Sequence, residues 1–339
     1  MLRFLGRRIF FMVLSVWGLA TAVFVMIKII PGDEASVAAG ESATPEMIEA
    51  TRERLGLDQP LPLQYVSFLA RLVRGDLGTS IITHQPITAN LADVLPATIE
   101  LVVSALLLMV VIAVPLGIIM AANRGNAIDF IGRVAAVVVA GMPIFWVAFM
   151  IQFLVAGSRA LPTSGSISIA YSVPHVTGFV TIDSLLAGNG AAFADVIAHL
   201  VLPAIVLAAP QAAVIVRTLR ASLLGELEED YALLATSKGA SRSRTLLRHA
   251  LQNAAIPTVT TIGLQVGFMI AGSVLVESVF SRPGIGSYLS SAVTQKDTFA
   301  VLGSVIFIGV VVILVNFIVD LVHMAIDPRV KRDTLGATA

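Results

Sequence analysis

The sequence predicts an all-α integral membrane protein with six transmembrane helices. Three observations support this fold class: 57% of the 339 residues are hydrophobic, only 13% are charged, and the hydrophobic residues are concentrated in six long runs. A soluble domain with this composition would aggregate, so lipid is the expected solvent for most of the surface. The chain has no cysteine, which excludes disulfides, thiolate metal sites and a cysteine nucleophile.

A transmembrane helix needs about 20 apolar residues, and a window of about 19 residues locates the runs within a single predicted transmembrane domain, 1–339. The first run is too long for a cleaved signal peptide, and Pro31-Gly32-Asp33 replaces the small-residue cleavage pattern, so we expect a retained helix. Prolines 115, 143, 203, 210 and 257 are expected to kink or end helices. The expected spans cover residues 9–30, 98–122, 134–156, 200–219, 254–276 and 300–326.

Basic residues are distributed unevenly between the two sets of segments that flank these spans. They concentrate near both termini, after the second span and in the polar segment 220–253. The opposite loops, 31–97 and 157–198, hold fewer, and several of these lie in the longer loop, where charge counts carry little weight. Because cytoplasmic flanks retain Lys and Arg, we expect cytoplasmic termini, a cytoplasmic 220–253 segment and two extracytoplasmic loops.

The first extracytoplasmic loop is expected to contain two short helices. Thr44-Pro45-Glu46 has the pattern of an N-cap, a first-turn proline and an acidic first turn, and Gly56 is the stop signal. A second helix is expected over 62–74, with an apolar stripe suited to the membrane interface or the lid of a bundle. The stripe consists of Val66, Leu69, Leu72 and Val73. The stretch 161–195 is rich in Gly, Ser, Pro and Thr, which predicts an irregular loop.

The polar segment has the pattern of a helical hairpin. From Leu224 to Pro257 it divides at Lys238-Gly239-Ala240, where Gly239 is expected to adopt a positive φ. In the first arm, acidic residues crowd the expected first turns, where the helix dipole favours anions. These acids are Glu226, Glu228, Glu229 and Asp230, and the apolar face is Leu227, Tyr231, Leu234 and Ala235.

The second arm separates apolar from basic residues. Its expected apolar face is Leu246, Leu247, Ala250 and Leu251, and its basic face is Arg242, Arg244 and Arg248. A groove on a soluble protein would hold such a hairpin by its apolar edge. The segment is therefore predicted to bind a partner protein.

Several motifs resemble, in order along nearly the whole chain, those of ABC transporter permeases in the branch that imports peptides and related solutes. In the polar segment the matches are Glu229-Asp230-Tyr231, Ala235, Lys238-Gly239, Leu247-Arg248-His249-Ala250-Leu251, Asn253 and Pro257. Elsewhere they are Met1-Leu2-Arg3-Phe4, Arg7-Arg8, Pro31-Gly32-Asp33, Leu55-Gly56-Leu57-Asp58-Gln59-Pro60, Gly75-Asp76-Leu77-Gly78-Thr79-Ser80, Leu95-Pro96-Ala97-Thr98, Pro143-Ile144-Phe145-Trp146, Phe280 to Gly286 and Asp327-Pro328-Arg329. The chain departs from the family pattern over Ala232 to Ser237 and at Arg282, where an aromatic residue is frequent.

This resemblance implies a type I ABC importer permease fold that forms half of a translocation pore working by alternating access. The implied partners are a second, related permease in a heterodimer, two ATP-binding subunits and an extracytoplasmic solute-binding protein, besides membrane lipid; no nucleic acid is expected. The segment 220–253 would be the coupling loop that enters a cleft of the ATP-binding subunit. Its implied contact residues are Glu229, Asp230, Tyr231, Ala235, Lys238, Gly239 and Ala240, with Arg242, Arg244 and Arg248 orienting the loop.

The sequence patterns of a catalytic or metal centre are absent. There is no G-x-x-x-x-G-K-[ST] phosphate loop, no H-E-x-x-H pair and no G-x-S-x-G elbow, and the five histidines are scattered. We therefore expect a non-catalytic transport subunit that binds no cofactor or metal, while ATP and Mg are used by partner subunits.

Polar residues inside the predicted spans are a second set of candidates, because charge in hydrocarbon is costly. Hydrogen bonding between helices is the more common role of such residues, and contact with the solute along a substrate path is the alternative. Small residues on the fifth span, Gly263, Gly267 and Ala271, would allow close helix approach. The substrate-path candidates are Gln265, Asn316 and Asp320, and further polar positions are Glu100, Gln152, Gln211 and Glu277.

Di- or oligopeptides are the solutes that the resemblance implies, while nickel complexes, glutathione or other small solutes of the same branch stay open. An ion-coupled secondary transporter is a further alternative, but it would need a relay of ionisable residues, and Asp320 alone is weak support. A membrane-bound enzyme would need a reactive cluster near one interface, which the sequence does not offer.

Overall fold

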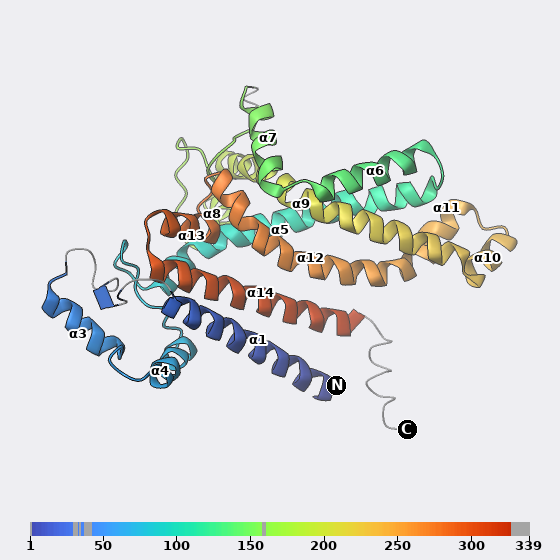
Figure 1. The fold of residues 1–339 in the computed structure, drawn as a ribbon. Helices are drawn as coiled ribbons and strands as arrows, with labels where there is room; N and C mark the ends of the chain where they lie inside the picture. The colour runs from blue at the N-terminus through green and yellow to red at the C-terminus, as the bar shows by residue number, and fades with distance from the viewer. Residues whose placement is uncertain (1, 30–32, 34, 37–42, 158–160, 327–339) are drawn as a thin grey trace. The chain divides into compact units, whose positions relative to one another are not determined.

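The computed structural model describes residues 2–29, 33, 35–36, 43–157 and 161–326 (Figure 1). Over these ranges the regular structure is helical, and extended backbone pairs only in one bridge between Thr79 and Pro86. This confirms the predicted all-helical class. Pro31-Gly32, Arg159 and the 327–339 segment, with its predicted basic flank, lie outside the described residues.

Five helices among the described residues are long and apolar enough to cross a membrane. They extend beyond the predicted spans, because helices continue past the hydrocarbon boundary while only apolar residues mark a span. They are α1 (Leu2–Ile29), α5 (Ile87–Ala122), α9 (Gly190–Glu228), α12 (Leu251–Val279) and α14 (Thr298–Ile326).

The run at 134–156 is broken, so the expectation of one helix there is wrong. It contains the end of α6 (Ala127–Gly141) and all of α7 (Ile144–Ala156), which meet at a bend of 106°. Pro143 precedes α7, and Met142 is extended with ψ 133°. A residue before proline avoids the helical region, and proline has no N–H to continue the ladder. At positions 115, 203, 210 and 257, by contrast, the helices continue through proline.

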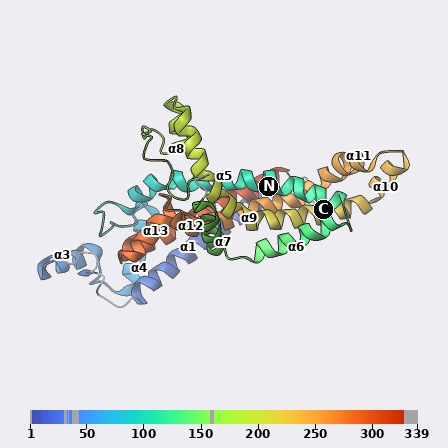
Figure 2. The same ribbon diagram turned by 90° about the horizontal axis from the view of Figure 1, so that it is seen from above.

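The chain divides into two compact units. The first contains Ala97–Arg282 and the chain from Val315 on. Within it α9 is the central helix and packs against α6, α7, α12 and the short α8 (Val180–Leu186), an arrangement that Figures 1 and 2 show from two sides. Five of the sixteen buried residues of α9 are alanines, and such small side chains let neighbouring backbones approach closely.

The second unit contains Leu2–Pro96 and Pro283–Leu314. Its core has two clusters of buried side chains: Val23, Leu302 and Ile306 in one, and Ile87, Leu91 and Ile285 in the other. Between α13 (Ile285–Thr294) and α14, the buried Asp297 accepts hydrogen bonds from Ser80 Oγ at 2.6 Å and from the backbone N of Ile81 at 3.0 Å. The Gly75 to Ser80 motif therefore ends in a turn that is fixed to the start of α14.

The segment between α1 and α5 contains the two predicted short helices. α3 (Pro45–Leu55) begins at Thr44, whose side chain accepts a hydrogen bond from Met47 N, and ends at Gly56 with φ 67°. α4 (Leu61–Val73) is confirmed as a helix, but its predicted stripe is divided. Leu72 packs against the second unit's core, whereas Val66 and Val73 are 61% and 88% exposed.

The stretch 161–195 is only partly irregular, so that expectation is wrong for α8 and for the first turns of α9. Asn189 caps α9 by accepting from Ala192 N at 3.0 Å. Before α8, the turn 176–178 is arranged around Asp183. Burial raises the pKa of this carboxyl, but hydrogen bonds from Thr177 and from the backbone N–H groups of the turn outweigh burial, and its pKa lies below the ordinary value.

Candidate functional site

The polar segment forms a helical hairpin at one end of α9 and α12, here called the 229–250 hairpin (Figures 1 and 2). α10 (Asp230–Ser237) is followed by a tight turn, and a short helix, α11 (Arg242–Arg244), then leads into a π-helix, Thr245–Ala250. Gly239 has φ 87°, which confirms the predicted turn. No atom lies within 4 Å of a Cβ added there, so the requirement for glycine is conformational rather than steric.

The second arm anchors the hairpin to the helices of the first unit. Leu246 and Ala250 are buried together with one residue of α5, two of α9 and one of α12; the cluster is Ala121, Leu219, Leu223, Leu246, Ala250 and Ala254. Leu247, predicted on the same face, is 51% exposed, and Thr245 is buried instead. The wider turn of the π-helix changes which side chains share one face. A buried face predicted with the α-helical period of 3.6 residues is therefore wrong here.

The first arm differs from prediction for a related reason. Glu229 is extended, with ψ 150°, so α9 ends before it and α10 begins after it. This break resets the helical phase between Leu227 and Leu234: Leu234 is 56% exposed, and Ala232 is the buried residue. Tyr231 faces inward, and its hydroxyl donates to Glu226 Oε2 at 2.5 Å. Burial is the larger cause that raises the pKa of Tyr231, and the hydrogen bond to the Glu226 carboxylate is the second.

The acidic residues of the first arm belong to two different helices. Glu226 and Glu228 lie in the last turn of α9, where the dipole does not favour anions, so the prediction for them is wrong. Glu228 accepts instead from Arg124 Nη1 at 2.6 Å. Of these four acids, only Glu229 and Asp230 lie at a helix N-terminus, where the dipole favours a negative charge. Glu229 is the N-cap of α10 and Asp230 is in its first turn.

A buried ion pair that the sequence analysis missed lies near the hairpin. Asp129, in the first turn of α6, is 1% exposed and accepts from Arg220 Nη2 of α9 at 2.8 Å, with Arg133 at 3.7 Å. The two partners are 91 positions apart in the chain. No sequence periodicity relates two residues so far apart. The sequence indicates only that Asp129 is in the first turn of a helix and that Arg220 lies one turn from an apolar span.

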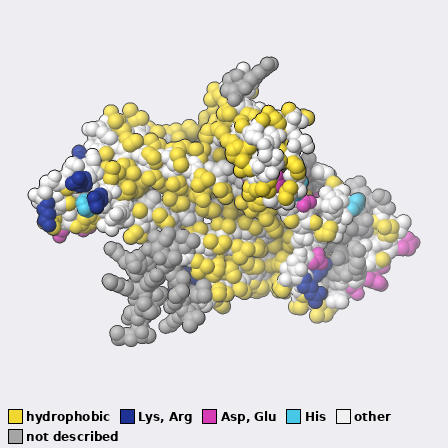
Figure 3. All heavy atoms as spheres, turned by 180° about the vertical axis from the view of Figure 1, so that it is seen from behind, with side chains coloured by type: hydrophobic (Ala, Val, Ile, Leu, Met, Phe, Trp, Pro, Cys, Tyr) yellow, Lys and Arg dark blue, Asp and Glu magenta, His cyan; other side chains and the backbone are white. Residues whose placement is uncertain are grey.

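The outward surface of the 229–250 hairpin combines exposed leucines with exposed charges. Leu233, Leu234 and Leu247 are between 51% and 56% exposed. Figure 3 shows Lys and Arg side chains gathered at this end of the molecule, while hydrophobic side chains cover the long helices. The exposed charged residues predicted here are Glu229, Asp230, Lys238, Arg242, Arg244 and Arg248. Leucine patches ringed by charge are typical of protein–protein docking surfaces.

A second polar cluster lies at the other end of α9 and α12, within the same unit. Arg282 is fully buried, and its Nη2 donates to Glu100 Oε2 at 3.0 Å. The other oxygen of Glu100 accepts from the backbone N of Thr181 at 2.8 Å and from its hydroxyl at 2.6 Å. Glu277 is also buried. Glu100 therefore joins α5, the start of α8 and the exit of α12 through charge-assisted hydrogen bonds.

Comparison with known proteins agrees with this architecture. Residues 113–332 match the family described as the binding-protein-dependent transport system inner membrane component, and residues 1–102 match its N-terminal region. The chain belongs to this family. It is a multi-pass permease of the inner membrane.

Named relatives cover the permease almost end to end. The di/tripeptide transport system permease protein DppB of Pseudomonas aeruginosa is 39% identical over 335 residues, which is 98% of this chain and 99% of the relative. The dipeptide transport system permease protein DppB of Escherichia coli K12 is 38% identical over 336 residues, again 98% and 99% of the two chains.

The substrate-path candidates of the permease are not all brought together. Asn316 of α14 lies against Gly267 of α12, where an added Cβ would be 3.1 Å from Asn316 Oδ1. Gln265 is buried, but two residues along a helix are separated by about 200°, so it points away from the Gly267 face. Asp320, one turn beyond Asn316, is partly buried. Close approach at Gly267 agrees with the predicted small-residue face.

Proposed function

We propose that this permease is one of two related membrane subunits of an ATP-driven importer of di- or oligopeptides, with the 229–250 hairpin as its cytoplasmic docking element for an ATP-binding subunit. The observation that carries the proposal is the hairpin itself, since an exposed patch of leucines and charges is fixed to the membrane helices by a buried core. The peptide class rests on the names of the relatives.

The hairpin is built to transmit force. Its buried residues contact α5, α9 and α12 at one cluster, so a displacement of the docked surface moves three spans. Tyr231 and Glu226 hold α10 to the end of α9, and Asp129 and Arg220 hold α6 to the same helix. Packed cores rearrange between discrete states rather than deform continuously. Hydrolysis of Mg-ATP in the partner would thus alternate the access of the pore.

The proposal assigns the remaining tasks to other chains. Two ATP-binding subunits supply the energy, a second permease completes the pore, and a solute-binding protein docks on the extracytoplasmic loops. This permease performs no covalent step. Its residues couple the ATP-binding subunit to the membrane helices, orient the hairpin and open or close the pore.

Deletion of Ser237 to Ala240, or Gly239→Asp, tests the docking role. We expect both changes to abolish uptake of a labelled dipeptide and co-purification of the ATP-hydrolysing subunits, while the permease remains in the membrane. Gly75→Asp is the matched control, because Gly75 also has a positive φ and no atom within 4 Å of an added Cβ. Normal uptake by the hairpin variants would refute the role.

A second experiment determines which energy source drives transport and which solute is transported. Vesicles containing the whole transporter are loaded with ATP or given a proton gradient, and uptake of labelled dipeptide, nickel complex and glutathione is compared. ATP-dependent dipeptide uptake is the expected result. Accumulation by this chain alone on a proton gradient would favour an ion-coupled transporter, and preference for a nickel complex or glutathione would correct the solute class.

A further inference from the structure

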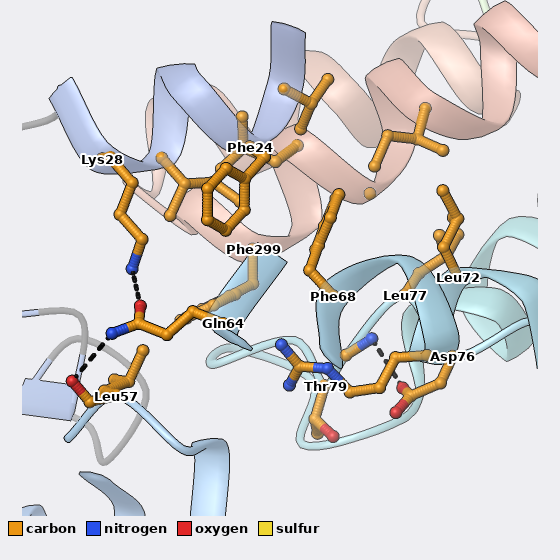
Figure 4. Close-up of a pocket in the computed structure, with 17 residues that line it drawn as sticks. Phe24, Lys28, Leu57, Gln64, Phe68, Leu72, Asp76, Leu77, Thr79 and Phe299 are labelled. Atoms are coloured by element: carbon orange, nitrogen blue, oxygen red, sulfur yellow. Dashed lines mark hydrogen bonds between the residues drawn. The ribbon is translucent and has the colours of Figure 1, made fainter. Parts of the chain in front are cut away.

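A cavity of about 340 Å³ lies in the second unit, and its lining includes no residue of the hairpin or of the predicted substrate path. It is bounded by α1, α4, the turn at 76–79 and the first turns of α14 (Figure 4). Cavities of this size hold small molecules or parts of larger ones. Its lining belongs entirely to described residues of one unit.

The lining has an apolar side and a polar rim. The apolar side is formed by Val23, Ile27, Phe68, Leu72, Leu302 and Ile306. On the rim, Lys28 Nζ donates to Gln64 Oε1 at 2.5 Å, and Gln64 Nε2 donates to the backbone O of Leu57 at 3.0 Å (Figure 4). Gln64 Nε2 also donates to the backbone O of Gln59 at 2.7 Å, so the ammonium is held in place.

Arg71 adds a second cation from the last turn of α4. Its guanidinium forms no hydrogen bond or ion pair with another described residue, although it lines the cavity. Among the described lining residues the carboxylate is Asp76, which already accepts from Gly78 N at 2.9 Å. The guanidinium of Arg71 therefore has donors that suit an anion with several acceptor oxygens, and the Lys28 ammonium lies on the same rim.

The position along α1 fixes the environment of this rim. Lys28 lies in the last turn of a 24-residue apolar span, Gly6–Ile29, so the rim lies where hydrocarbon gives way to headgroups. Phe24 and Tyr65 pack edge to face beside it with ring centroids 5.1 Å apart, and aromatic side chains are typical of this boundary. α4 leaves Val66 and Val73 exposed, as expected of a helix lying in the interface.

We propose that this cavity is a binding site for an anionic phospholipid. The phosphodiester accepts hydrogen bonds from Arg71 and Lys28, and the first part of one acyl chain follows the apolar side between α1 and α14. A bound lipid of this kind would join α4 to the first and last spans of the unit. The proposal depends on the membrane location of the permease and is independent of the docking role of the hairpin.

The test uses the intact purified transporter and native mass spectrometry with phosphatidylglycerol, phosphatidylcholine and diacylglycerol. We expect selective retention of phosphatidylglycerol, and a loss of about fivefold to tenfold in its affinity for Arg71→Gln and for Lys28→Gln. Arg74→Gln is the matched control, because Arg74 ends the same helix but is exposed and does not line the cavity. Ile27→Phe, which narrows the apolar side and keeps both cations, should also weaken retention.

Three outcomes would overturn the proposal: equal retention of phosphatidylcholine or diacylglycerol, an equal effect of Arg74→Gln and Arg71→Gln, or displacement of the lipid by millimolar glycerol 3-phosphate. The last would identify a soluble phosphate compound as the ligand. Unchanged thermal midpoints for the variants establish that any loss of lipid is not a loss of fold.

Discussion

The 229–250 hairpin and the Glu100–Arg282 cluster lie at opposite ends of α9 and α12 and use charge in opposite ways. In the hairpin most ionised side chains are exposed, and apolar anchors such as Leu246 and Ala250 are buried. At the other end the ions themselves are buried, and Arg282 Nε and Nη1 have no hydrogen-bond partner among the described residues.

This difference indicates what each region is suited to do. Exposed charges are screened and contribute little to folding, so they are available to a partner. A buried pair loses its hydration and contributes little net stability when intact, but breaking it leaves an uncompensated charge. The hairpin is therefore suited to the docking role proposed for it, whereas the Glu100–Arg282 cluster fastens α5, α8 and the exit of α12 to one another.

The largest loss of stability is expected from breaking the Glu100–Arg282 ion pair. Glu100→Ala removes the carboxylate that accepts the hydrogen bond of the buried Arg282 and should destabilise the permease by about 3–5 kcal/mol. Thermal unfolding of the purified protein in detergent measures the change. Arg124→Ala, which breaks the exposed pair with Glu228, should cost less than about 1 kcal/mol. Equal losses for the buried and exposed pairs would mean that burial does not set the contribution of these charges.

A smaller effect is expected at the hairpin turn. Gly239→Ala places a Cβ at φ 87°, which should cost about 1–2 kcal/mol locally, without a clash. Gly225→Ala is the control, since Gly225 is helical and has no atom within 4 Å of an added Cβ, and it should stabilise by about 0.5–1 kcal/mol. Hydrogen exchange of residues 229–250 reports the local change. Equal protection in both variants would mean that the turn conformation is unimportant.

The smallest change in stability is expected on the hairpin's outward surface, where the functional effect should be large. Leu234→Lys should change the free energy of unfolding by less than about 0.5 kcal/mol, because Leu234 is 56% exposed. Retention of the ATP-hydrolysing subunits during purification should nevertheless fall. Val66→Lys, equally exposed on α4 at 61%, is the control and should leave retention unchanged. Retention by Leu234→Lys would place the docking contact elsewhere.

Helix ends, turns and apolar spans could be predicted from the sequence wherever the residues that determine them lie in one short segment. Thr44 and Gly56 bound α3, Gly239 makes the hairpin turn, and the apolar runs locate the long helices. Each depends on the conformational preference of one residue or on the solvent that a run of side chains requires. These features therefore needed no knowledge of distant neighbours.

Periodicity failed wherever the backbone left regular α-helix. The break at Glu229 and the π-helix after Arg244 reset the register, so Leu234 and Leu247 are exposed while Ala232 and Thr245 are buried. The bend at Pro143 divides a run that hydropathy alone treats as continuous.

The sequence by itself determined that the chain is a bundle of membrane helices with a polar hairpin, because hydropathy and turn chemistry are encoded locally. Only the tertiary structure decided which charges are partners: Asp129 with Arg220, and Glu100 with Arg282, are separated by 91 and 182 positions. Such pairs form because a buried ion needs a counter-ion, and which residue supplies it depends on how the helices pack. No pattern along the chain contains that information.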